Sequence, residues 1–297
     1  MKTSDQPVIS VIVPTYQGAH RILITLSSLA NQRFTDFEVI VVIDGSTDNT
    51  AAVITKAKLP MPVRVHEQEN RGRAGARNAG AALAKSPYLV FFDDDVEIPE
   101  NVIAEYVQMI NVHPVVVGAF YPLYKIKNEF AIYSSYLNDQ WTTTLPVRGK
   151  MSAPYLSAAN FFIERKVFEQ EGGFNGALPD TEDFDLAVRL FEKGITLFYN
   201  PDLKVGHAIQ QSFGEYATRL LQYKNAQRLL LAENPRAAKY ITSHIKPKGV
   251  KALIYACFSA PLYIRLIDAG FFRILPQKLR FRLYNLILVA YPLHHSK

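Results

Sequence analysis

The first hundred residues alternate between short apolar runs and segments with the apolar spacing of helices. The apolar runs, which predict strands, are residues 8–13, 37–43, 63–66 and 88–92. The segments with helical spacing are residues 19–31, 48–57, 74–84 and 99–111. Apolar strands separated by helices are typical of a parallel sheet that is covered on both faces. We therefore predict an α/β fold in which ligands bind beyond the carboxyl ends of the strands.

The pattern becomes less regular after residue 111. Residues 121–156 are rich in aromatic side chains but weak in periodicity, so we predict an irregular insertion that crosses an edge of the sheet. Helical patterning returns in residues 167–169, 186–191 and 215–232. Two apolar blocks with basic residues follow, in residues 248–272 and 279–293. The longest uncharged apolar stretch, residues 252–264, is shorter than the ~20 residues that span a bilayer.

Charge divides the chain near residue 207. Residues 208–297 hold 14 of the 33 basic residues but only 3 of the 27 acidic ones, which leaves residues 1–207 net acidic. We therefore predict one domain over residues 1–207 that holds the functional site, and a basic, mostly helical region over residues 208–297 that faces an anionic partner. A single cysteine, Cys257, excludes a disulfide framework and a multi-cysteine zinc site. A hydrophobic share of 48% excludes a disordered chain.

The strongest chemical signal is the run Asp93-Asp94-Asp95 at the end of the fourth predicted strand. Carboxylates this close repel one another, and a cation relieves the repulsion. Mg²⁺ and Mn²⁺ prefer oxygen ligands and share them with phosphates. The alternative is an acidic cluster that stabilises the N-terminus of the next helix. We favour metal binding.

Two further segments carry charged groups next to predicted helices. Residues 70–78 combine glycines with three arginines at a helix start, which suits a phosphate group, the alternative being a solvated basic turn. Residues 180–185 are acidic, and a carboxylate there can take a proton from an attacking hydroxyl. Taken alone, this second cluster is better explained by helix capping. His207 alone is typical of a structural histidine.

Together these stretches resemble glycosyltransferase family 2, whose members have the GT-A fold. The matching segments, which occur in the family's order within residues 8–207, are residues 11–16, 41–48, 70–78, 91–95, 172–174 and 182–185. The resemblance implies a Rossmann-like, mixed and mainly parallel sheet flanked by helices. It also implies transfer of a sugar from a nucleotide sugar to a hydroxyl group, with inversion at the anomeric carbon.

The resemblance also implies roles for single residues. The general base is Asp183. The substrate-binding residues are Glu182, Asp93, Asp94 and Gly173. The nucleotide-binding residues are Pro14, Thr15, Tyr16, Asp44, Arg71, Arg73, Arg77 and Asp93. The ligands of a Mn²⁺ or Mg²⁺ cofactor are Asp95 and His207.

These expectations define a metal-dependent, inverting glycosyltransferase of the hexosyltransferase type. We expect it to use a UDP-sugar in surface polysaccharide or glycolipid synthesis. A polyprenyl-phosphate glycosyltransferase and a non-catalytic nucleotide-sugar-binding scaffold are the alternatives. The expected partners are the nucleotide sugar and a glycan or lipid-linked acceptor.

The composition of residues 208–297 matches helices that lie in the interface of an anionic membrane. The alternative is a helical subdomain that packs on the body or forms an oligomer contact. Nucleic acid is not expected, because the aromatic residues of this region lie inside apolar blocks rather than among the basic residues. No secretory signal opens the sequence, so we expect a cytoplasmic protein, peripheral on the cytoplasmic face of the membrane.

Overall fold

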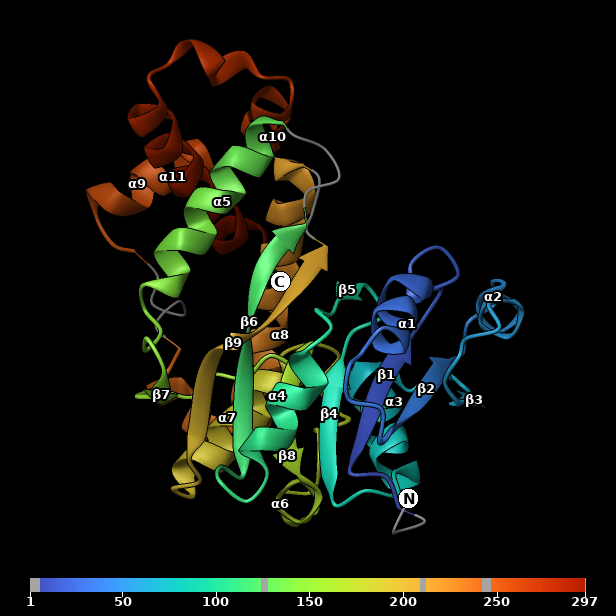
Figure 1. Cartoon of the computed structure of the whole chain (residues 1–297). Helices are drawn as coiled ribbons and strands as arrows, with labels where there is room; N and C mark the ends of the chain where they lie inside the picture. The colour runs from blue at the N-terminus through green and yellow to red at the C-terminus, as the bar shows by residue number, and fades with distance from the viewer. Residues whose placement is uncertain (1–5, 124–127, 209–211, 242–246, 297) are drawn as a thin grey trace. The chain divides into compact units, whose positions relative to one another are not determined.

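The chain divides into two units. The computed structural model describes residues 6–123, 128–208, 212–241 and 247–296 (Figure 1). One unit comprises residues 1–121 and 145–207, and the other comprises residues 122–144 and 208–297. Each unit has a hydrophobic core of its own. A division at residue 207 is thus present, but residues 122–144 belong with the C-terminal region.

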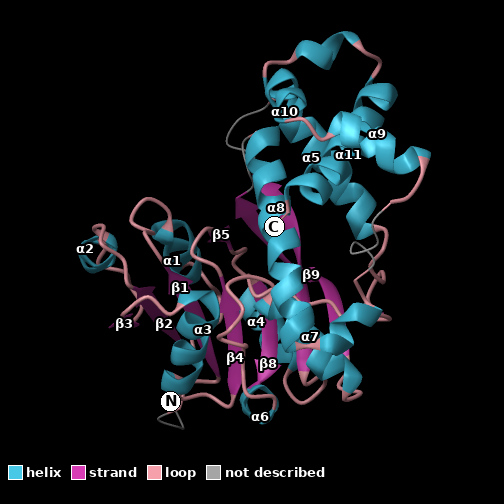
Figure 2. Ribbon diagram, turned by 180° about the vertical axis from the view of Figure 1, so that it is seen from behind, coloured by secondary structure: helices cyan, strands magenta, loops and turns pink. Residues whose placement is uncertain are grey.

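The first unit is built on a mixed sheet with the strand order β3-β2-β1-β4-β8-β6-β9-β5, in which β7 also pairs with β9 (Figure 2). The described strands are β1 (Ile9–Thr15), β2 (Phe37–Asp44), β3 (Val63–Gln68), β4 (Tyr88–Phe92), β5 (Val96–Glu97), β6 (Val115–Leu123), β7 (Gly149–Lys150), β8 (Asn160–Glu164) and β9 (Leu197–Ala208). Strands β3, β2, β1 and β4 run parallel, whereas β8 is antiparallel to both β4 and β6. The four predicted strands are therefore confirmed, and the sequence pattern misses β5 to β9.

Helices cover both faces of this sheet. They are α1 (Ile22–Ala30), α2 (Thr50–Lys56), α3 (Gly72–Leu83), α4 (Val102–Met109), α6 (Arg165–Gln170) and α7 (Glu182–Glu192). Successive residues of β1 pack into two separate cores, since Ile12 joins the core that contains Ala76 of α3, while Val11 joins the core that contains Leu26 of α1. Burial of both faces explains why β1, β2 and β4 are apolar throughout.

The second unit is helical. Its elements are α5 (Glu129–Thr142), α8 (Phe213–Glu233), α9 (Val250–Phe258), α10 (Pro261–Asp268) and α11 (Gln277–His295), with the short 3-10 helices η1 (Pro235–Lys239) and η2 (Phe271–Ile274). Asp268 accepts hydrogen bonds from the backbone N–H groups of Phe213 and Gly214 at 2.8 and 3.0 Å. One of the few acidic residues of the C-terminal region thus serves as a cap for α8.

The prediction of an irregular insertion over residues 121–156 is wrong for residues 129–142, and residues 124–127 lie outside the described residues. Residues 129–142 form α5, and Asn128 caps it by accepting a hydrogen bond from the N–H of Ala131. Phe130 and Tyr133 lie on one helical face and are buried in the core of the second unit. Tyr133 also donates to Asn285 Oδ1 at 2.6 Å. Aromatic residues have only moderate helix propensity, so packing against the C-terminal helices stabilises α5.

No single helix among the described residues is both long and apolar enough to cross a membrane. Among the described helices, α9 and α10 together reach the necessary length and hydropathy, but their axes differ by a bend of 54°.

Candidate active site

Asp93 and Asp95 at the end of β4 lie close to His207. Oxygen atoms of the two carboxylates and a ring nitrogen of the histidine all lie within 4.8 Å of one another. His207 Nε2 is 3.7 Å from Asp95 Oδ1. The histidine reaches this place because β9 pairs with β5, which follows the aspartates directly, and sets His207 opposite Val96. Two carboxylates and an imidazole are a ligand set that fits a divalent cation.

The electrostatics of this cluster also favour a cation. Burial and the neighbouring Asp93 raise the pKa of Asp95, and His207 offsets only part of this rise. Although burial opposes ionisation of Asp93, Arg77 and His207 hold the pKa of that carboxyl below its usual value. Arg77 thus stabilises the charge of Asp93, and a bound cation would stabilise the charge of Asp95.

Asp94 belongs to a different set of contacts. Its side chain is buried and accepts hydrogen bonds from Thr15 Oγ1 at 2.5 Å and from Arg21 Nε at 2.8 Å. Arg21 also donates to the carbonyl of Tyr16 at 2.9 Å. These contacts link the end of β4 to the end of β1. They give the polar side chains of Asp94 and Thr15 a structural role that needs no substrate. The predicted substrate contact of Asp94 stays a prediction, and Arg21 is a residue that the sequence analysis missed.

Arg77 on α3 joins the two acidic clusters. Its side chain is 4% exposed, and its two terminal nitrogens donate to Asp93 Oδ1 at 2.7 Å and to Glu182 Oε1 at 2.6 Å. Although burial opposes the charge, the two carboxylates raise the pKa of Arg77 further above its ordinary value. The guanidinium of Arg77 thus holds one carboxylate of each cluster in place, and its predicted contact with a nucleotide stays a prediction.

Replacing Arg77 by glutamine is expected to destabilise the protein. The side chain of Glu182 is 4% exposed, so it would remain as a buried charge without its partner, at a cost of about 3–5 kcal/mol of unfolding free energy. Urea unfolding followed by circular dichroism measures this loss. The matched control is Arg33→Gln, which breaks the exposed ion pair with Glu100 and should cost less than about 1 kcal/mol. Equal losses in the two variants would contradict the role of Arg77.

Glu182 and Asp183 occupy the first turn of α7. The preceding Thr181 has a φ of 68°, a left-handed conformation that is rare for a β-branched residue. Asp183 accepts hydrogen bonds from the N–H of Phe184 at 2.7 Å and from the N–H of Ala158 at 3.4 Å. Burial and the like charge of Glu182 raise the pKa of Asp183 to about 7. A carboxylate with this pKa suits general-base catalysis near neutral pH.

The pH dependence of kcat/KM is expected to follow the pKa of Asp183. Only the deprotonated carboxylate can accept a proton, so the rate should fall about tenfold per pH unit below pH 7 and level off above it. Initial rates between about pH 5 and about pH 9 test this expectation. Glu182→Gln removes the like charge and should move the midpoint to lower pH. A profile with the same midpoint in both proteins would contradict the cause assigned to the shift.

The ends of β1, β2 and β3 lie beside several of the residues that are predicted to bind the nucleotide. Asp44 Oδ1 accepts hydrogen bonds from Gln68 Nε2 at 2.7 Å and from the N–H of Arg71 at 2.9 Å. Gly45 has a φ of 71°, and a Cβ atom there would lie 2.7 Å from the backbone nitrogen of Asn70, so only glycine fits. Tyr16, at the end of β1, is half-exposed. The predicted nucleotide contacts of Asp44 and Tyr16 therefore lie at one edge of the sheet.

The remaining residues of the predicted nucleotide site are less closely associated. Pro14 precedes Thr15 in β1 and is partly buried. Arg73 has a half-exposed side chain, and its Nη1 lies 3.4 Å from Asp180 Oδ1. Arg71 contributes its backbone N–H to Asp44, and its side chain is exposed. Their contacts with a nucleotide stay predictions.

Gly173 lies in a tight loop that Asn78 holds. Phe174 donates its N–H to Asn78 Oδ1 at 2.9 Å, and Asn78 Nδ2 donates to the carbonyl of Phe174 at 2.8 Å. With a φ of 69°, Gly173 is so close that a Cβ atom would lie 2.7 Å from Asn78 Oδ1. These contacts explain the glycine by packing. The substrate contact predicted for Gly173 is not tested by them, and the role of Asn78 was missed.

Comparison with known proteins decides the family. A family model described as glycosyl transferase family 2 matches residues 10–172. The chain belongs to glycosyltransferase family 2. The resemblance found in the sequence is thereby confirmed, and the matched residues include both Arg77 and the aspartates after β4.

Several curated glycosyltransferases resemble the chain over part of its length. An uncharacterized glycosyltransferase of Haemophilus influenzae is 29% identical over 191 residues, which are 63% of each chain. Validoxylamine A glucosyltransferase of Streptomyces hygroscopicus is 43% identical over 98 residues, 32% of this chain and 23% of that enzyme. UDP-Glc:alpha-D-GlcNAc-diphosphoundecaprenol beta-1,3-glucosyltransferase WfaP of Escherichia coli is 26% identical over 63% of this chain and 72% of its own. The chain thus spans less than two thirds of the first two of these relatives.

Solved structures confirm the predicted fold class. The mannosyltransferase PcManGT of Pyrobaculum calidifontis, in complex with GDP-Man and Mn²⁺, has a TM-score of 0.59 at 20% identity over 97% of this chain and 86% of that one. S. aureus TarS 1-349, in complex with UDP-GlcNAc, has a TM-score of 0.58 at 18% identity over 96% and 89%. Both support a GT-A α/β fold, and their coverage of this chain extends into the helices of the C-terminal region.

Proposed function

We propose that this family 2 member transfers a sugar from a nucleoside diphosphate sugar to an acceptor hydroxyl, with inversion at the anomeric carbon. The observation that carries the proposal is the buried Arg77, which contacts Asp93 of the candidate metal cluster and Glu182 beside Asp183. Asp183, whose carboxylate accepts protons near neutral pH, is thus the neighbour in sequence of Glu182, which Arg77 links to the metal cluster. This arrangement suits a displacement in which Asp183 deprotonates the attacking hydroxyl.

Asp93, Asp95 and His207 would hold the divalent cation, which we propose to be Mn²⁺ or Mg²⁺. When bound, such an ion supplies positive charge that stabilises the departing diphosphate. Glu182 keeps one buried oxygen, Oε2, that accepts no hydrogen bond from the described residues. That oxygen is suited to orient a sugar hydroxyl, because a buried acceptor without a donor is costly until a ligand supplies one.

The proposed donor is a UDP-sugar. Gln68 Oε1, beside Asp44, is also buried and lacks a hydrogen-bond donor among the described residues. The N3–H of uracil would supply that donor, whereas cytosine would have to use its N4 amino group instead of a ring N–H. Guanine also carries an imino N–H, so a GDP-sugar is the nearest competitor.

The proposed acceptor is a glycan carried on a lipid, in the synthesis of a surface polysaccharide or glycolipid at the cytoplasmic face of the membrane. The relative WfaP, whose name specifies a diphosphoundecaprenol-linked acceptor, supports this proposal. Transfer to a polyprenyl phosphate itself uses the same chemistry and differs only in the acceptor.

A panel of UDP- and GDP-sugars, with and without Mn²⁺, tests the proposal. Binding of a donor to the native state raises Tm by mass action, and we expect the largest rise for a UDP-sugar with Mn²⁺. Release of the nucleoside diphosphate from the same mixtures then reports turnover, with water in place of the acceptor hydroxyl. A rise in Tm without any release of nucleotide, in the wild type and in Asp183→Asn alike, would favour the scaffold alternative and overturn the transferase.

A further inference from the structure

The second unit exposes large apolar side chains that its own core leaves uncovered. The most exposed, with their exposed fractions, are Val250 (75%), Leu253 (67%), Leu262 (61%), Phe271 (64%), Ile274 (86%) and Leu279 (53%). Helix α9 has no buried side chain, although its sequence is apolar. Phe271, Ile274 and Leu279 fall within nine residues of sequence, and exposed apolar side chains that lie together are typical of a site that binds a partner or a membrane.

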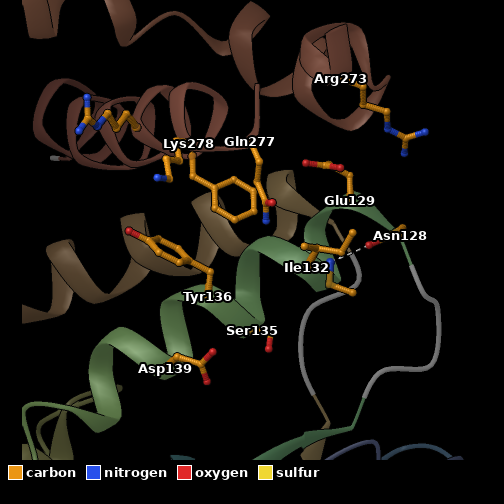
Figure 3. A pocket seen from close by; sticks show the side chains of 12 residues that line it. Asn128, Glu129, Ile132, Ser135, Tyr136, Asp139, Arg273, Gln277 and Lys278 are labelled. Atoms are coloured by element: carbon orange, nitrogen blue, oxygen red, sulfur yellow. Dashed lines mark hydrogen bonds between the residues drawn. The ribbon is translucent and has the colours of Figure 1, made fainter. Parts of the chain in front are cut away.

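A pocket of about 1180 Å³ lies beside part of this apolar surface, within the second unit. Figure 3 shows α5, with Ser135 and Asp139, on one side of it, and η2 and the start of α11, with Arg273 and Lys278, on the other. Arg282, one turn after Lys278, also lines the pocket. Phe271, Ile274 and Leu279 therefore belong to the same short segment as the basic residues.

The pocket has an excess of positive charge. Its acidic residues are Glu129 and Asp139, and Glu129 already pairs with Arg280 at 2.7 Å. Arg273, Lys278 and Arg282 form no ion pair with the carboxylates that the structure describes. Unpaired cations in a pocket attract an anionic group, and arginine and lysine both bind phosphate.

We propose that the second unit docks on an anionic lipid bilayer through residues 271–282. Arg273, Lys278 and Arg282 bind lipid phosphate groups at the mouth of the pocket, while Phe271, Ile274 and Leu279 enter the boundary between headgroups and acyl chains. Interfacial segments combine basic and apolar side chains in this way, and the long stems of arginine and lysine allow their charges to stay among the headgroups. The inference does not depend on the proposed transferase chemistry.

The apolar side chains favour a bilayer over a nucleic acid. Backbone phosphates of a nucleic acid would satisfy the basic residues equally well. They would leave Ile274, which is 86% exposed, in water, whereas a bilayer removes it from water together with Phe271. The two partners therefore differ in whether binding depends on the apolar side chains.

Flotation of the full chain with vesicles tests the proposal. Vesicles of phosphatidylcholine with phosphatidylglycerol should carry the protein up the gradient, and vesicles of phosphatidylcholine alone should carry much less. The double variant Phe271→Ser with Ile274→Ser should reduce the bound fraction about tenfold or more, because the apolar contribution is lost. The double variant Lys278→Gln with Arg282→Gln should remove the preference for phosphatidylglycerol.

The matched control is the double variant Val147→Ser with Lys56→Gln, which changes exposed residues of the first unit and should leave binding unchanged. Circular dichroism and Tm show whether every variant is folded. If the double variant Phe271→Ser with Ile274→Ser bound vesicles as well as the wild type does, the surface would be purely electrostatic, as for a nucleic acid. That result would overturn the proposal. Binding of inorganic phosphate to the lipid-free protein, lost in Lys278→Gln with Arg282→Gln, without flotation on any vesicle would likewise identify a site for free phosphate instead of a bilayer.

Discussion

Asp183→Asn should lower kcat for sugar transfer by a factor of about 10²–10⁴, the usual contribution of a general base. Asparagine keeps the size of the side chain but cannot take a proton from the acceptor hydroxyl. Asp183 is not among the residues of the candidate metal cluster or those at the ends of β1 to β3, so donor binding should be preserved. Steady-state rates and the Tm shift caused by UDP-sugar with Mn²⁺ separate the two effects.

The matched control for this variant is Asp202→Asn. Asp202 has a side chain that is 65% exposed and pairs with Arg148 on the surface of the first unit. Its loss should leave kcat within about twofold of the wild type, since such pairs contribute little to stability. If Asp183→Asn kept a rate comparable with that of Asp202→Asn, Asp183 would not be the base.

Asp95→Asn should weaken the response to Mn²⁺ and lower kcat by about 10²-fold or more. The change removes one of two carboxylates from the set Asp93, Asp95 and His207, and a catalytic cation contributes several kcal/mol of charge stabilisation. Titration of Mn²⁺ at saturating donor gives the apparent metal affinity. The concentration for half-maximal rate should rise together with the loss of rate.

The neighbouring Asp94→Asn provides a sharp comparison for this prediction. Asp94 contacts Thr15 and Arg21 and is not among the three residues that could hold an ion. Its replacement should lower Tm, because a buried charged hydrogen bond is weakened, while the Mn²⁺ concentration for half-maximal rate stays the same. A shift in that concentration as large as the one in Asp95→Asn would mean that the cation site includes Asp94.

The sequence predicted β1, β2 and β4 because those strands are buried on both faces and therefore apolar throughout. Strand β9 lacks that signal, since Pro201, Asp202 and Lys204 interrupt its apolar residues. Strand β8 has only five residues and lies within the antiparallel part of the sheet. Helix α5 was missed because its aromatic residues pack against a distant part of the chain, and that contact is absent from any local pattern.

The candidate site shows a similar limit. The sequence shows which carboxylates lie at the strand ends, but it does not show which side chain each of them contacts. Asp93, Asp94 and Asp95 are consecutive, yet they contact Arg77, Arg21 and His207 respectively. Consecutive side chains at the end of a strand point in different directions, so the division of roles among them needs coordinates. The bridging role of Arg77 likewise depends on α3 and α7 meeting across more than a hundred residues of sequence.

The discontinuity of the second unit has a practical consequence for shortened forms of the protein. The chain leaves the sheet-bearing part after Tyr121, returns at Leu145 and leaves it again after His207. A truncation at residue 207 would leave α5 without the helices it packs against. Phe130 and Tyr133 would lose the aromatic neighbours that α8 and α11 provide. The C-terminal helices therefore cannot be removed without consequence, since their loss would expose the apolar face of α5 and favour aggregation.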